Sequence, residues 1–403
     1  MSKKSLALWA IALNLAPFGA LAQADPGIRF SGFGSLVAAR SSERNADFTL
    51  NIVQPKGPGF SRGTDFGSDS RVGLQVDLQM SQRFSAVIQG ISERRHDDSF
   101  NPVLSMAHLK FQALPGLSLR AGRLPLAAYL ISEYLKVGYA TPWVRPPVDL
   151  YHFNPFTYMD GGDLGWQTNA GDLSISGQFF GGSTSAKLPV TGEAKVTGKN
   201  LGGLSLTLAY GAATFRSSYT RMKFTLDSPA LDGSTGPYAA LRTLPAPFGG
   251  DPALADQFQV KRHNLTYLSV GFTYDPGGWF LMAEGARKGG DEDQLLNNTG
   301  AYLTWGVRFG AWTPYLTVAR KTMDSPTTHP NPIVNAILSG SDEAQSSYSG
   351  GLRWDMHKNI VMKAQYDRIK NGRTSHGALI NPQPGFRTGE GYNVTSLGLD
   401  FLF

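Results

Sequence analysis

The chain has 403 residues, a formal net charge of +6 at pH 7 and no cysteine. Disulfide frameworks and thiolate metal sites are therefore excluded, and so small a charge for this length gives no reason to expect a nucleic-acid partner. Glycine is abundant, at 47 residues, and the mean hydropathy of −0.20 fits a chain in which half of each strand faces water.

The N-terminus has the features of an export signal. Two lysines near the start precede an apolar run at residues 6–15, which is too short to span a bilayer. A small-x-small cleavage site follows at Ala20-Leu21-Ala22, with a second possible cut after Ala24. We therefore predict a signal peptide at residues 1–22 and a barrel formed by residues 23–403. No later apolar run approaches the length of a membrane helix, which leaves a secreted soluble protein or a membrane barrel.

Most of the remaining chain alternates apolar and polar residues with a period of two. Residues 71–79 are the clearest example, because Val72, Leu74, Val76 and Leu78 alternate with polar residues or glycine. The same alternation recurs at residues 172–179, 301–309 and 360–367. This period places the two sets on opposite faces of a β-strand, and no helical spacing fits these segments better.

Short turns and long polar connections follow one another along the chain. The short turns are expected at residues 80–82, 114–116, 169–171, 276–278 and 357–359. The long connections are expected near residues 41–68, 124–161, 214–262, 323–345 and 371–390. This alternation predicts an all-β fold, a transmembrane antiparallel up-and-down barrel of about 16 strands with both termini on the periplasmic side.

Aromatic residues gather beside the expected short turns. They are Phe84, Phe111, Tyr274, Trp279, Phe309, Trp312 and Trp354. Aromatic rings are enriched where a membrane meets water, so this placement indicates a girdle at the short-turn end of a barrel.

The last strand runs to the end of the chain and stops on an aromatic residue. Counting back by two gives one face of Phe403, Phe401, Leu399 and Leu397. The opposite face has Leu402, Asp400, Gly398 and Ser396. This ending resembles the C-terminal signature of bacterial outer-membrane barrels that their assembly machinery reads. The resemblance implies that Phe403, Phe401 and Leu399 form the assembly signal.

Two internal segments add to the resemblance. Residues 117–123, Leu-Ser-Leu-Arg-Ala-Gly-Arg, resemble the strand before the third loop of Gram-negative porins, and residues 160–164, Asp-Gly-Gly-Asp-Leu, resemble the point where the chain re-enters the barrel wall. The chain therefore resembles a divergent member of the Gram-negative outer-membrane porin superfamily. The loop lacks the acidic Pro-Glu-Phe-Gly-type motif of the best-known porins, which leaves pore size and charge preference open.

The resemblance implies a function, a location and partners. It implies a homotrimer in the outer membrane with a third loop folded into each barrel and passive diffusion of small hydrophilic solutes and ions. Outer-membrane lipid, lipopolysaccharide and the barrel-assembly machinery are the other expected partners, and no cofactor, bound metal or nucleic acid is expected.

We expect the loop at residues 123–161 to narrow the pore. A barrel of this size leaves an aqueous lumen, and Pro142, Pro146 and Pro147 stiffen the loop by fixing backbone φ. The predicted constriction residues are Arg71, Arg120, Glu133, Arg145 and Asp149. The predicted pore-lining residues are Gln75, Asp77, His108, Arg308, Arg353 and Lys363.

One hypothesis gives these charges a common role. Arg71 and Arg120 form a basic wall opposite Glu133 and Asp149 on the loop, and the field between them sets ion preference. The alternative is that these are ordinary solvated lumen charges. The arginines favour a mild anion preference, whereas Asp77, Asp367 and Asp400 oppose it.

Two other functions remain open from the sequence. A substrate-specific channel can use the aromatic loop residues as a binding surface: Tyr129, Tyr134, Tyr139, Trp143, Tyr151, Phe153 and Phe156. A barrel enzyme needs a nucleophile and a base, and neither HExxH, GxSxG nor a Walker sequence occurs, so an enzyme is not expected. The acidic run at residues 291–293 is either a divalent-cation site that bridges lipopolysaccharide or a solvated loop.

Overall fold

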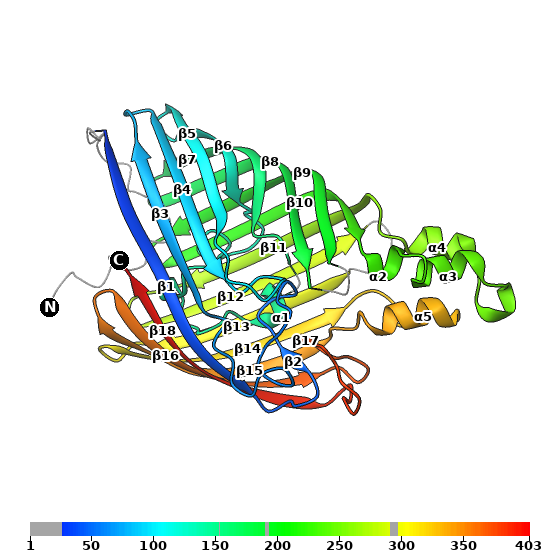
Figure 1. Ribbon diagram of the computed structural model, residues 1–403. Coiled ribbons are helices and arrows are strands. Elements are labelled where there is room, and N and C mark those ends of the chain that lie inside the picture. Colours follow the sequence, from blue (N-terminus) through cyan, green and yellow to red (C-terminus); the bar gives the residue numbers. More distant parts are fainter. Residues whose placement is uncertain (1–25, 153, 190–192, 291–296) are drawn as a thin grey trace.

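The computed structural model describes residues 26–152, 154–189, 193–290 and 297–403. Sixteen antiparallel strands among these residues form one closed barrel, in which β1 pairs with both β3 and β18 (Figure 1). This confirms the predicted up-and-down barrel. The predicted signal peptide at residues 1–22 and the acidic run at residues 291–293 lie outside the described residues.

The strands of the barrel follow one another around the wall in chain order. They are β1 Gly27–Ser41, β3 Arg71–Gln79, β4 Phe84–Glu93, β5 Val103–Leu114, β6 Leu117–Pro125, β7 Tyr158–Ala170, β8 Leu173–Leu188, β9 Ala194–Tyr210, β10 Ala213–Asp227, β11 His263–Tyr274, β12 Trp279–Gly290, β13 Asn298–Val307, β14 Trp312–Met323, β15 Gln345–His357, β16 Ile360–Asn371 and β18 Gly391–Leu402. Two short strands, β2 Asp47–Phe48 and β17 Leu379–Ile380, pair in the outer loops.

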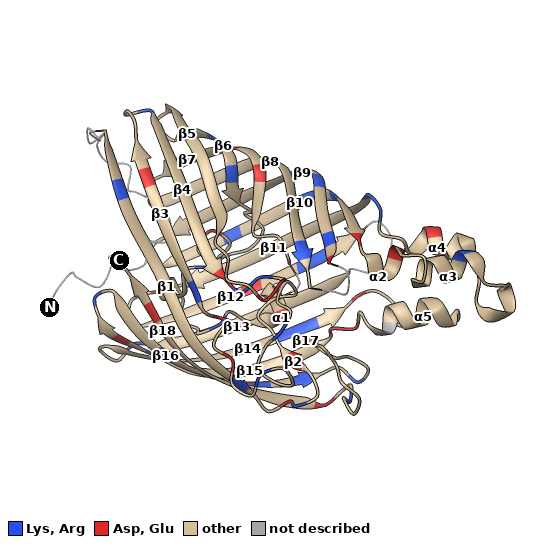
Figure 2. Ribbon diagram, in the orientation of Figure 1, with Lys and Arg blue, Asp and Glu red and all other residues tan. Residues whose placement is uncertain are grey.

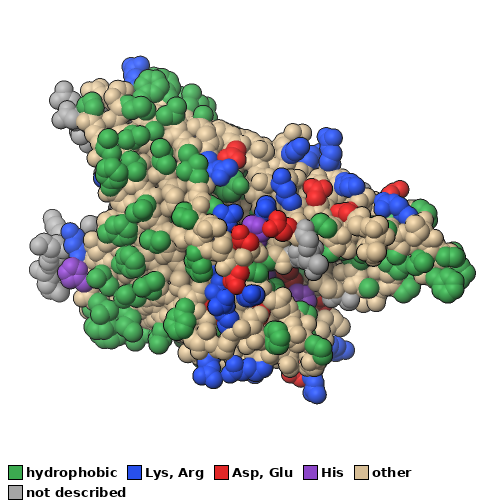
Figure 3. All heavy atoms as spheres, viewed as in Figure 1, with side chains coloured by type: hydrophobic (Ala, Val, Ile, Leu, Met, Phe, Trp, Pro, Cys, Tyr) green, Lys and Arg blue, Asp and Glu red, His purple; other side chains and the backbone are tan. Residues whose placement is uncertain are grey.

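Side chains alternate across the wall as the period of two predicts. In β3, Leu74 is exposed on the outer face while Arg71 points into the lumen. Apolar side chains cover much of the outer wall in Figure 3. The aromatic girdle is confirmed at the short-turn end, where Trp312 stacks on Trp354 with ring centroids 4.9 Å apart.

One predicted boundary is wrong. The long connection expected at residues 214–262 begins too early, because Ala213–Asp227 is strand β10. The strand has serine, threonine and arginine on its lumen face at Arg216, Ser218 and Thr220, and this polar composition resembles a loop. The connection that leaves β10 starts at residue 228.

A helical extension stands beyond the long-loop end of the barrel (Figure 1). It contains α2 Pro229–Asp232, α3 Pro237–Thr243, η2 Ala246–Phe248, α4 Pro252–Phe258 and α5 Pro332–Ser339. These helices share a small apolar core, formed by Tyr238, Leu241, Ala255, Phe258, Val334 and Leu338. None of the helices in the described part of the chain is long and apolar enough to cross a membrane.

Two capping residues fix where the longer helices of the extension begin. The Asp251 carboxylate accepts hydrogen bonds from the first-turn amides of α4, and Asn331 does the same for α5. Each is followed by a proline, whose missing N–H would have no intrahelical partner at that position. Local sequence alone therefore sets these two helix starts.

The barrel closes at a seam between β1 and β18. The Gly32 amide donates to the Phe403 carbonyl at 2.7 Å, and the Phe403 amide donates back at 3.0 Å. A Cβ atom added at Gly32 would lie 2.2 Å from the Phe403 ring, and one at Gly34 would lie 2.3 Å from the Phe401 ring. The two aromatic rings thus lie across glycines on the neighbouring strand, an arrangement that pins strand register.

We expect Gly34→Val to weaken this seam. The added side chain would displace the Phe401 ring, and overpacking of this kind costs about 1–3 kcal/mol. Gly285→Val in β12 is the matched control, because nothing lies within 4 Å of a Cβ at that position. Urea unfolding in detergent micelles, read by the heat-dependent gel mobility of the folded barrel, measures the difference. Equal midpoints for the two variants would contradict the role given to the seam.

Candidate functional site: the loop inside the barrel

The connection between β6 and β7 folds into the lumen and contains η1 Gly138–Ala140 and α1 Val148–Tyr151. It spans residues 126–157 and is shorter than the predicted 123–161. Strands β6 and β7 extend further into the connection than predicted. Arg123 and Asp160 stand directly opposite each other across them, with Arg123 Nε 2.7 Å from Asp160 Oδ1. We call residues 126–157 the inner loop.

One side of the inner loop is part of the main apolar core. Leu130, Ile131 and Leu150 are buried in one cluster with wall residues that include Tyr267 and Met282. Burying each such side chain contributes roughly 1.5–3 kcal/mol. The loop is therefore packed against one side of the barrel as firmly as the core of a soluble domain.

The aromatic residues of the loop belong to this packing. Tyr129, Trp143, Tyr151 and Phe156 are all buried in the same cluster, and Tyr129 meets Tyr151 edge-on with ring centroids 5.7 Å apart. They do not form the open aromatic surface that a substrate-specific channel would use. Phe153 lies outside the described residues.

A buried carboxylate of the wall holds the first part of the loop. Glu284 of β12 accepts a hydrogen bond from the Leu130 amide at 2.8 Å and one from the Ser269 hydroxyl at 2.7 Å. It also accepts a hydrogen bond from the Tyr151 hydroxyl. One side chain thus joins both ends of the inner loop to the wall.

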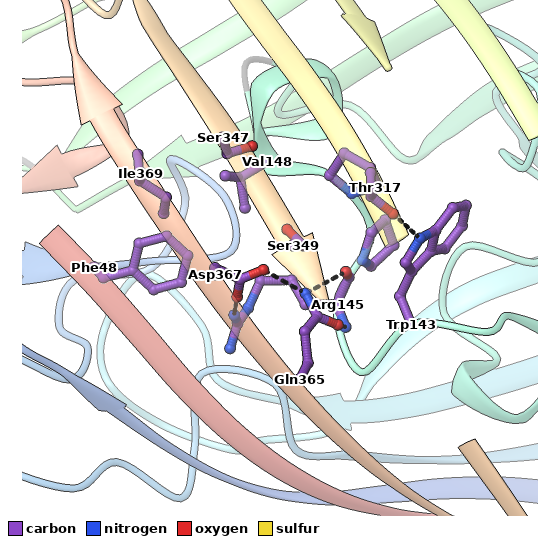
Figure 4. A pocket seen from close by; sticks show the side chains of 12 residues that line it. Phe48, Trp143, Arg145, Val148, Thr317, Ser347, Ser349, Gln365, Asp367 and Ile369 are labelled. Carbon is purple, nitrogen blue, oxygen red and sulfur yellow. Dashed lines mark hydrogen bonds and ion pairs between the residues drawn. The ribbon is translucent and has the colours of Figure 1, made fainter. Parts of the chain in front are cut away.

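Arg145 holds the second part of the loop (Figure 4). Its guanidinium lies 2.5 Å from Asp69 of the first outer loop and 3.1 Å from Asp367 of β16. It also donates to the Ser396 hydroxyl at 3.0 Å and lies over the Phe48 ring. The expectation that Arg145 faces the open lumen is wrong, because two carboxylates hold it between the loop and the wall at 2% exposure.

A small cavity of about 10 Å³ remains beside this arginine, between the loop and strands β14 to β16. Its lining includes Trp143, Thr317 and Gln365, which Figure 4 shows around it. Trp143 Nε1 donates to the Thr304 and Thr317 hydroxyls at 3.2 and 3.1 Å. Such a volume holds about one water molecule, so this cavity is too small to pass a solute.

Asp149 is also on the wall side of the loop. Its carboxylate is fully buried and accepts a hydrogen bond from the Ser347 hydroxyl of β15 at 2.5 Å. Burial raises the pKa of this carboxyl from 3.8 to about 6, although the bond to Ser347 opposes the shift. The predicted opposition of Asp149 to Arg71 and Arg120 is therefore wrong, because Asp149 points away from the lumen.

Two predicted pore-lining cations hold the backbone of the loop instead. Arg353 donates to the carbonyls of Tyr139 and Thr141 at 2.6 and 3.1 Å. Lys363 donates to the Gly138 carbonyl at 2.7 Å and lies 2.8 Å from Asp400. Both side chains reach the lumen side of the wall, as predicted, and the loop covers them there.

The charged side chains beside the open lumen form three separate groups. In the first, Glu93 of β4 accepts from Lys136 of the loop at 2.6 Å, and Arg71 lies 3.9 Å from the same carboxylate. In the second, Glu133 of the loop pairs with Arg216 of β10 at 2.7 Å. Glu133 thus faces a basic wall as predicted, but the wall residue is Arg216 rather than Arg71 or Arg120.

The third group is on the wall alone. Arg120 forms a bidentate pair with Asp163 of the next strand, with a shortest distance of 2.6 Å, and Gln178 donates to the same carboxylate at 2.6 Å. His108 faces the lumen on the neighbouring strand, at the register position opposite Gly122. Asp163 thus neutralises the charge of Arg120, whose side chain stays partly exposed.

The other predicted lining residues lie nearer the short turns. Gln75 donates to Asp77 at 3.0 Å and accepts from Gln89 at 2.7 Å. Gln75 and Asp77 both face the lumen, as predicted. Arg308 follows β13 in a short turn, where it pairs with Asp275 at 2.7 Å and lies over the ring of the buried Phe280.

Sequence reasoning missed Glu284, Arg216, Asp163 and Asp69. For the first two, a signal was present: each is a charged residue on the lumen face of an alternating strand. Asp163 is likewise placed inward by the strand that begins before it. Asp69 ends an outer loop, and no local pattern links it to Arg145.

Comparisons with known proteins fit this geometry. No protein-family model matches the chain. Outer membrane porin C of Salmonella typhimurium is 30% identical over 156 residues, which cover 34% of this chain and 40% of that porin. The match therefore spans less than half the length of this curated relative.

Solved structures match almost end to end. The outer membrane channel DcaP of Acinetobacter baumannii has a TM-score of 0.58 at 11% identity, covering 96% of this chain and 99% of its own. The anion-selective porin from Comamonas acidovorans has a TM-score of 0.54 at 12% identity, covering 94% and 100%. The chain therefore shares its fold with these outer-membrane channels, a closed sixteen-stranded barrel with a loop folded inside it.

Proposed function

We propose that this protein is an outer-membrane porin through which small hydrophilic solutes and ions diffuse passively. One observation supports this above all: a closed barrel of sixteen strands is too wide for its own side chains to fill, and one firmly anchored loop narrows it from one side. The remaining lumen is lined by hydrophilic side chains, with paired charges on strands and loop.

The lumen charges support a mild preference for anions. Beside the open path, Arg71, Arg120 and Arg216 are on the wall and Lys136 is on the loop. The carboxylates that pair with them are Glu93, Glu133 and Asp163. These three groups together hold four cations and three carboxylates, a net charge of +1, while Asp77 nearer the short turns pairs with Arg29 at 3.3 Å.

A general channel is favoured over a substrate-specific channel. Binding surfaces for sugars or apolar solutes need accessible aromatic faces, and the loop aromatics Tyr129, Trp143 and Tyr151 are buried. The proposal includes no catalytic role, because the charged side chains of the three groups pair with one another. Ester and peptide substrates should therefore be left intact.

The other parts of the proposal concern export and assembly. Residues 1–22 serve as a signal peptide, and Phe403, Phe401 and Leu399, which face outward in the last strand, serve as the signal for the assembly machinery. The working unit is a homotrimer, and a solved structure of the same fold, OmpT of Vibrio cholerae, is described as a trimer form.

The channel is tested by conductance and by liposome swelling across a size series of sugars. We expect ohmic conductance from the purified protein and swelling rates that fall as the sugars grow. Arg353→Met should raise the entry of the larger sugars several-fold, because it frees the backbone of the loop at Tyr139 and Thr141. Arg308→Met, which removes an arginine that pairs with Asp275 in a short turn, is the control.

Two results would overturn the assignment. A protein that inserts into bilayers without conducting is not a porin. If Arg353→Met and Arg308→Met sieve sugars alike, the loop does not set the size limit, even though the barrel conducts.

Ion preference depends on the two wall arginines of the open path. Arg71→Ala combined with Arg120→Ala should move the reversal potential in a salt gradient toward cation selectivity. Removing two charges beside an aqueous path changes an ion's energy by about 1 kcal/mol, or about fivefold in the permeability ratio. Replacing Arg373 and Arg387 of an exposed outer loop by alanine removes the same charge away from the lumen. An unchanged reversal potential in the first variant would remove these arginines from the constriction.

The attachment of the loop should depend on pH through Asp149. Its pKa is raised to about 6, so between about pH 4 and 6 the folded protein binds a proton that the unfolded chain has lost. The free energy of unfolding therefore falls as pH rises through this range, by up to about 3 kcal/mol. Asp149→Asn removes this dependence, so the variant should match wild type near pH 4 and exceed it at pH 7 in urea unfolding. A constant difference between the two proteins would contradict this.

A further inference from the structure

The charged side chains of strands β5 and β6 are all basic. The two strands contain Lys110, Arg120 and Arg123 and neither aspartate nor glutamate (Figure 2). Lys110 and Arg120 stand directly opposite each other, so both face the same side of the wall, which for Arg120 is the lumen. Arg123, three positions after Arg120, is on the other face, where it pairs with Asp160. The lumen therefore has two adjacent cations on neighbouring strands.

One carboxylate serves both cations of this row. Asp163 is next to Arg120 in the row, pairs with it at 2.6 Å and accepts a hydrogen bond from Gln178 at 2.6 Å. No carboxylate in the described part of the chain forms an ion pair with Lys110. Like charges directly opposite each other destabilise a sheet, so the barrel itself gives no reason to place Lys110 beside Arg120.

Arg120 keeps donors for a second partner. Its Nε and Nη2 donate to Asp163, whereas its Nη1 forms no hydrogen bond with any described residue. The Arg120 side chain is 26% exposed, and Lys110 is also partly exposed. A guanidinium has five N–H donors and an ammonium has three. Both side chains can therefore donate to an anion that enters from the lumen.

The next row toward the long loops leaves room beside the two cations. It begins with His108, two positions before Lys110 on the lumen face of β5, whose Nδ1 has no hydrogen-bond partner among the described residues. Gly122, Gly161 and Gly182 continue the row across β6, β7 and β8. A Cβ atom at these glycines would lie 2.2, 2.0 and 2.3 Å from a carbonyl oxygen of a neighbouring strand. The wall therefore contributes no side chain there except His108.

The two cations lie between the inner loop and the short-turn opening of the barrel. Lys110 is opposite Ser85, the second residue of β4 after a short turn. Glu93, which binds Lys136 of the inner loop, is the last residue of the same strand. Ser85 and Glu93 are eight positions apart, which is about 27 Å along a strand. A solute that has passed Glu93 thus meets Lys110 before it leaves the barrel.

We propose that Lys110 and Arg120, with His108 beside them, form a site that binds one compact oxyanion, the carboxylate or phosphate group of a small solute. We call these three residues the exit site. Lysine and arginine N–H groups match the oxygens of both anions, and Asp77, two strands away on β3, does not compete because it pairs with Arg29 at 3.3 Å.

The exit site gives the channel a property that its net charge does not. Solutes with a carboxylate or phosphate group share one saturable site after the constriction, and binding there is weak enough for release because both cations are open to water. The role in transport rests on the proposed channel function, whereas the binding itself does not.

Binding is tested without transport, on the full chain in neutral detergent. Saturation-transfer NMR follows the methyl protons of acetate and of methyl phosphate as each is titrated. We expect both probes to bind wild type and to bind Lys110→Gln about tenfold more weakly, because hydrogen bonds to charged groups are among the stronger ones. Lys110→Arg keeps the charge and should bind nearly as wild type does. Lys358→Gln is the matched control, since it removes a lysine from the short turn between β15 and β16 at the same end of the barrel.

Transport is tested by the block of chloride current in planar bilayers. Added acetate or methyl phosphate should reduce the current through wild type, and the half-blocking concentration should rise about tenfold in Lys110→Gln. A protein that binds the probes without conducting would overturn the proposed channel and leave the exit site. A protein that conducts without binding the probes would overturn the exit site and leave the channel. Lys110→Met gives the same comparison if Lys110→Gln fails to fold.

Two further results would count against the exit site. If Lys110→Gln and Lys358→Gln weaken binding equally, the probes respond to the overall charge of the barrel and not to a site. If Lys110→Arg loses as much affinity as Lys110→Gln, the charge at this position does not hold the anion. The two probes also separate the sources of the oxyanion, because tighter binding of methyl phosphate would identify phosphate groups and tighter binding of acetate would identify carboxylates.

Discussion

The structure depends on one constraint, which is that backbone N–H and C=O groups inside a membrane must be paired within the protein. A sheet satisfies this only when its first and last strands meet. Here β1 pairs with β18 from Phe33 and Leu402 to Ser41 and Val394, and the first half of the same strand pairs with β3. Because Phe401 and Phe403 lie across Gly34 and Gly32, the register of this seam is set by shape, and the seam in turn places Ser396 and Asp400 where the inner loop needs them.

The inner loop uses that wall as a soluble domain uses its core. Its apolar side chains pack against one side of the barrel, and its polar contacts go to Glu284, Arg353, Lys363 and Asp367, which come from the three strands β12, β15 and β16. Breaking a buried pair such as Arg145 with Asp367 would leave an uncompensated charge. Because these contacts hold the loop at several points, the fixed side chains beside the open path are the ones that would set the selectivity of the proposed channel.

Local periodicity explains how much of the fold the sequence predicts. An alternation of two is a property of neighbouring residues, so the outward face of Phe401 and the inward face of Arg71 follow directly from it, as does the barrel itself. The predicted start of the connection after β10 was wrong. Serines and Arg216 on the lumen face of this strand look like loop residues in the sequence, because the sequence does not show the barrel wall around them.

The partners of the site could not be predicted in the same way. Arg145 meets Asp367, which is 222 positions later, and Glu133 meets Arg216, which is 83 positions later. Such pairings depend on how the loop lies against a curved wall, and strand periodicity contains no information about that. Composition indicated a charged constriction, but only the packing of Leu130, Trp143 and Leu150 decides that Asp149 faces the wall and Glu133 faces the lumen.

The helical extension has a core of its own, in which Tyr238, Leu241 and Val334 pack together away from the barrel. Phe248 of η2 is exposed there, and the extension stands beyond the long-loop end of the barrel (Figure 1). Substitutions at its surface can therefore change the outer face of the protein without changing the core of the inner loop.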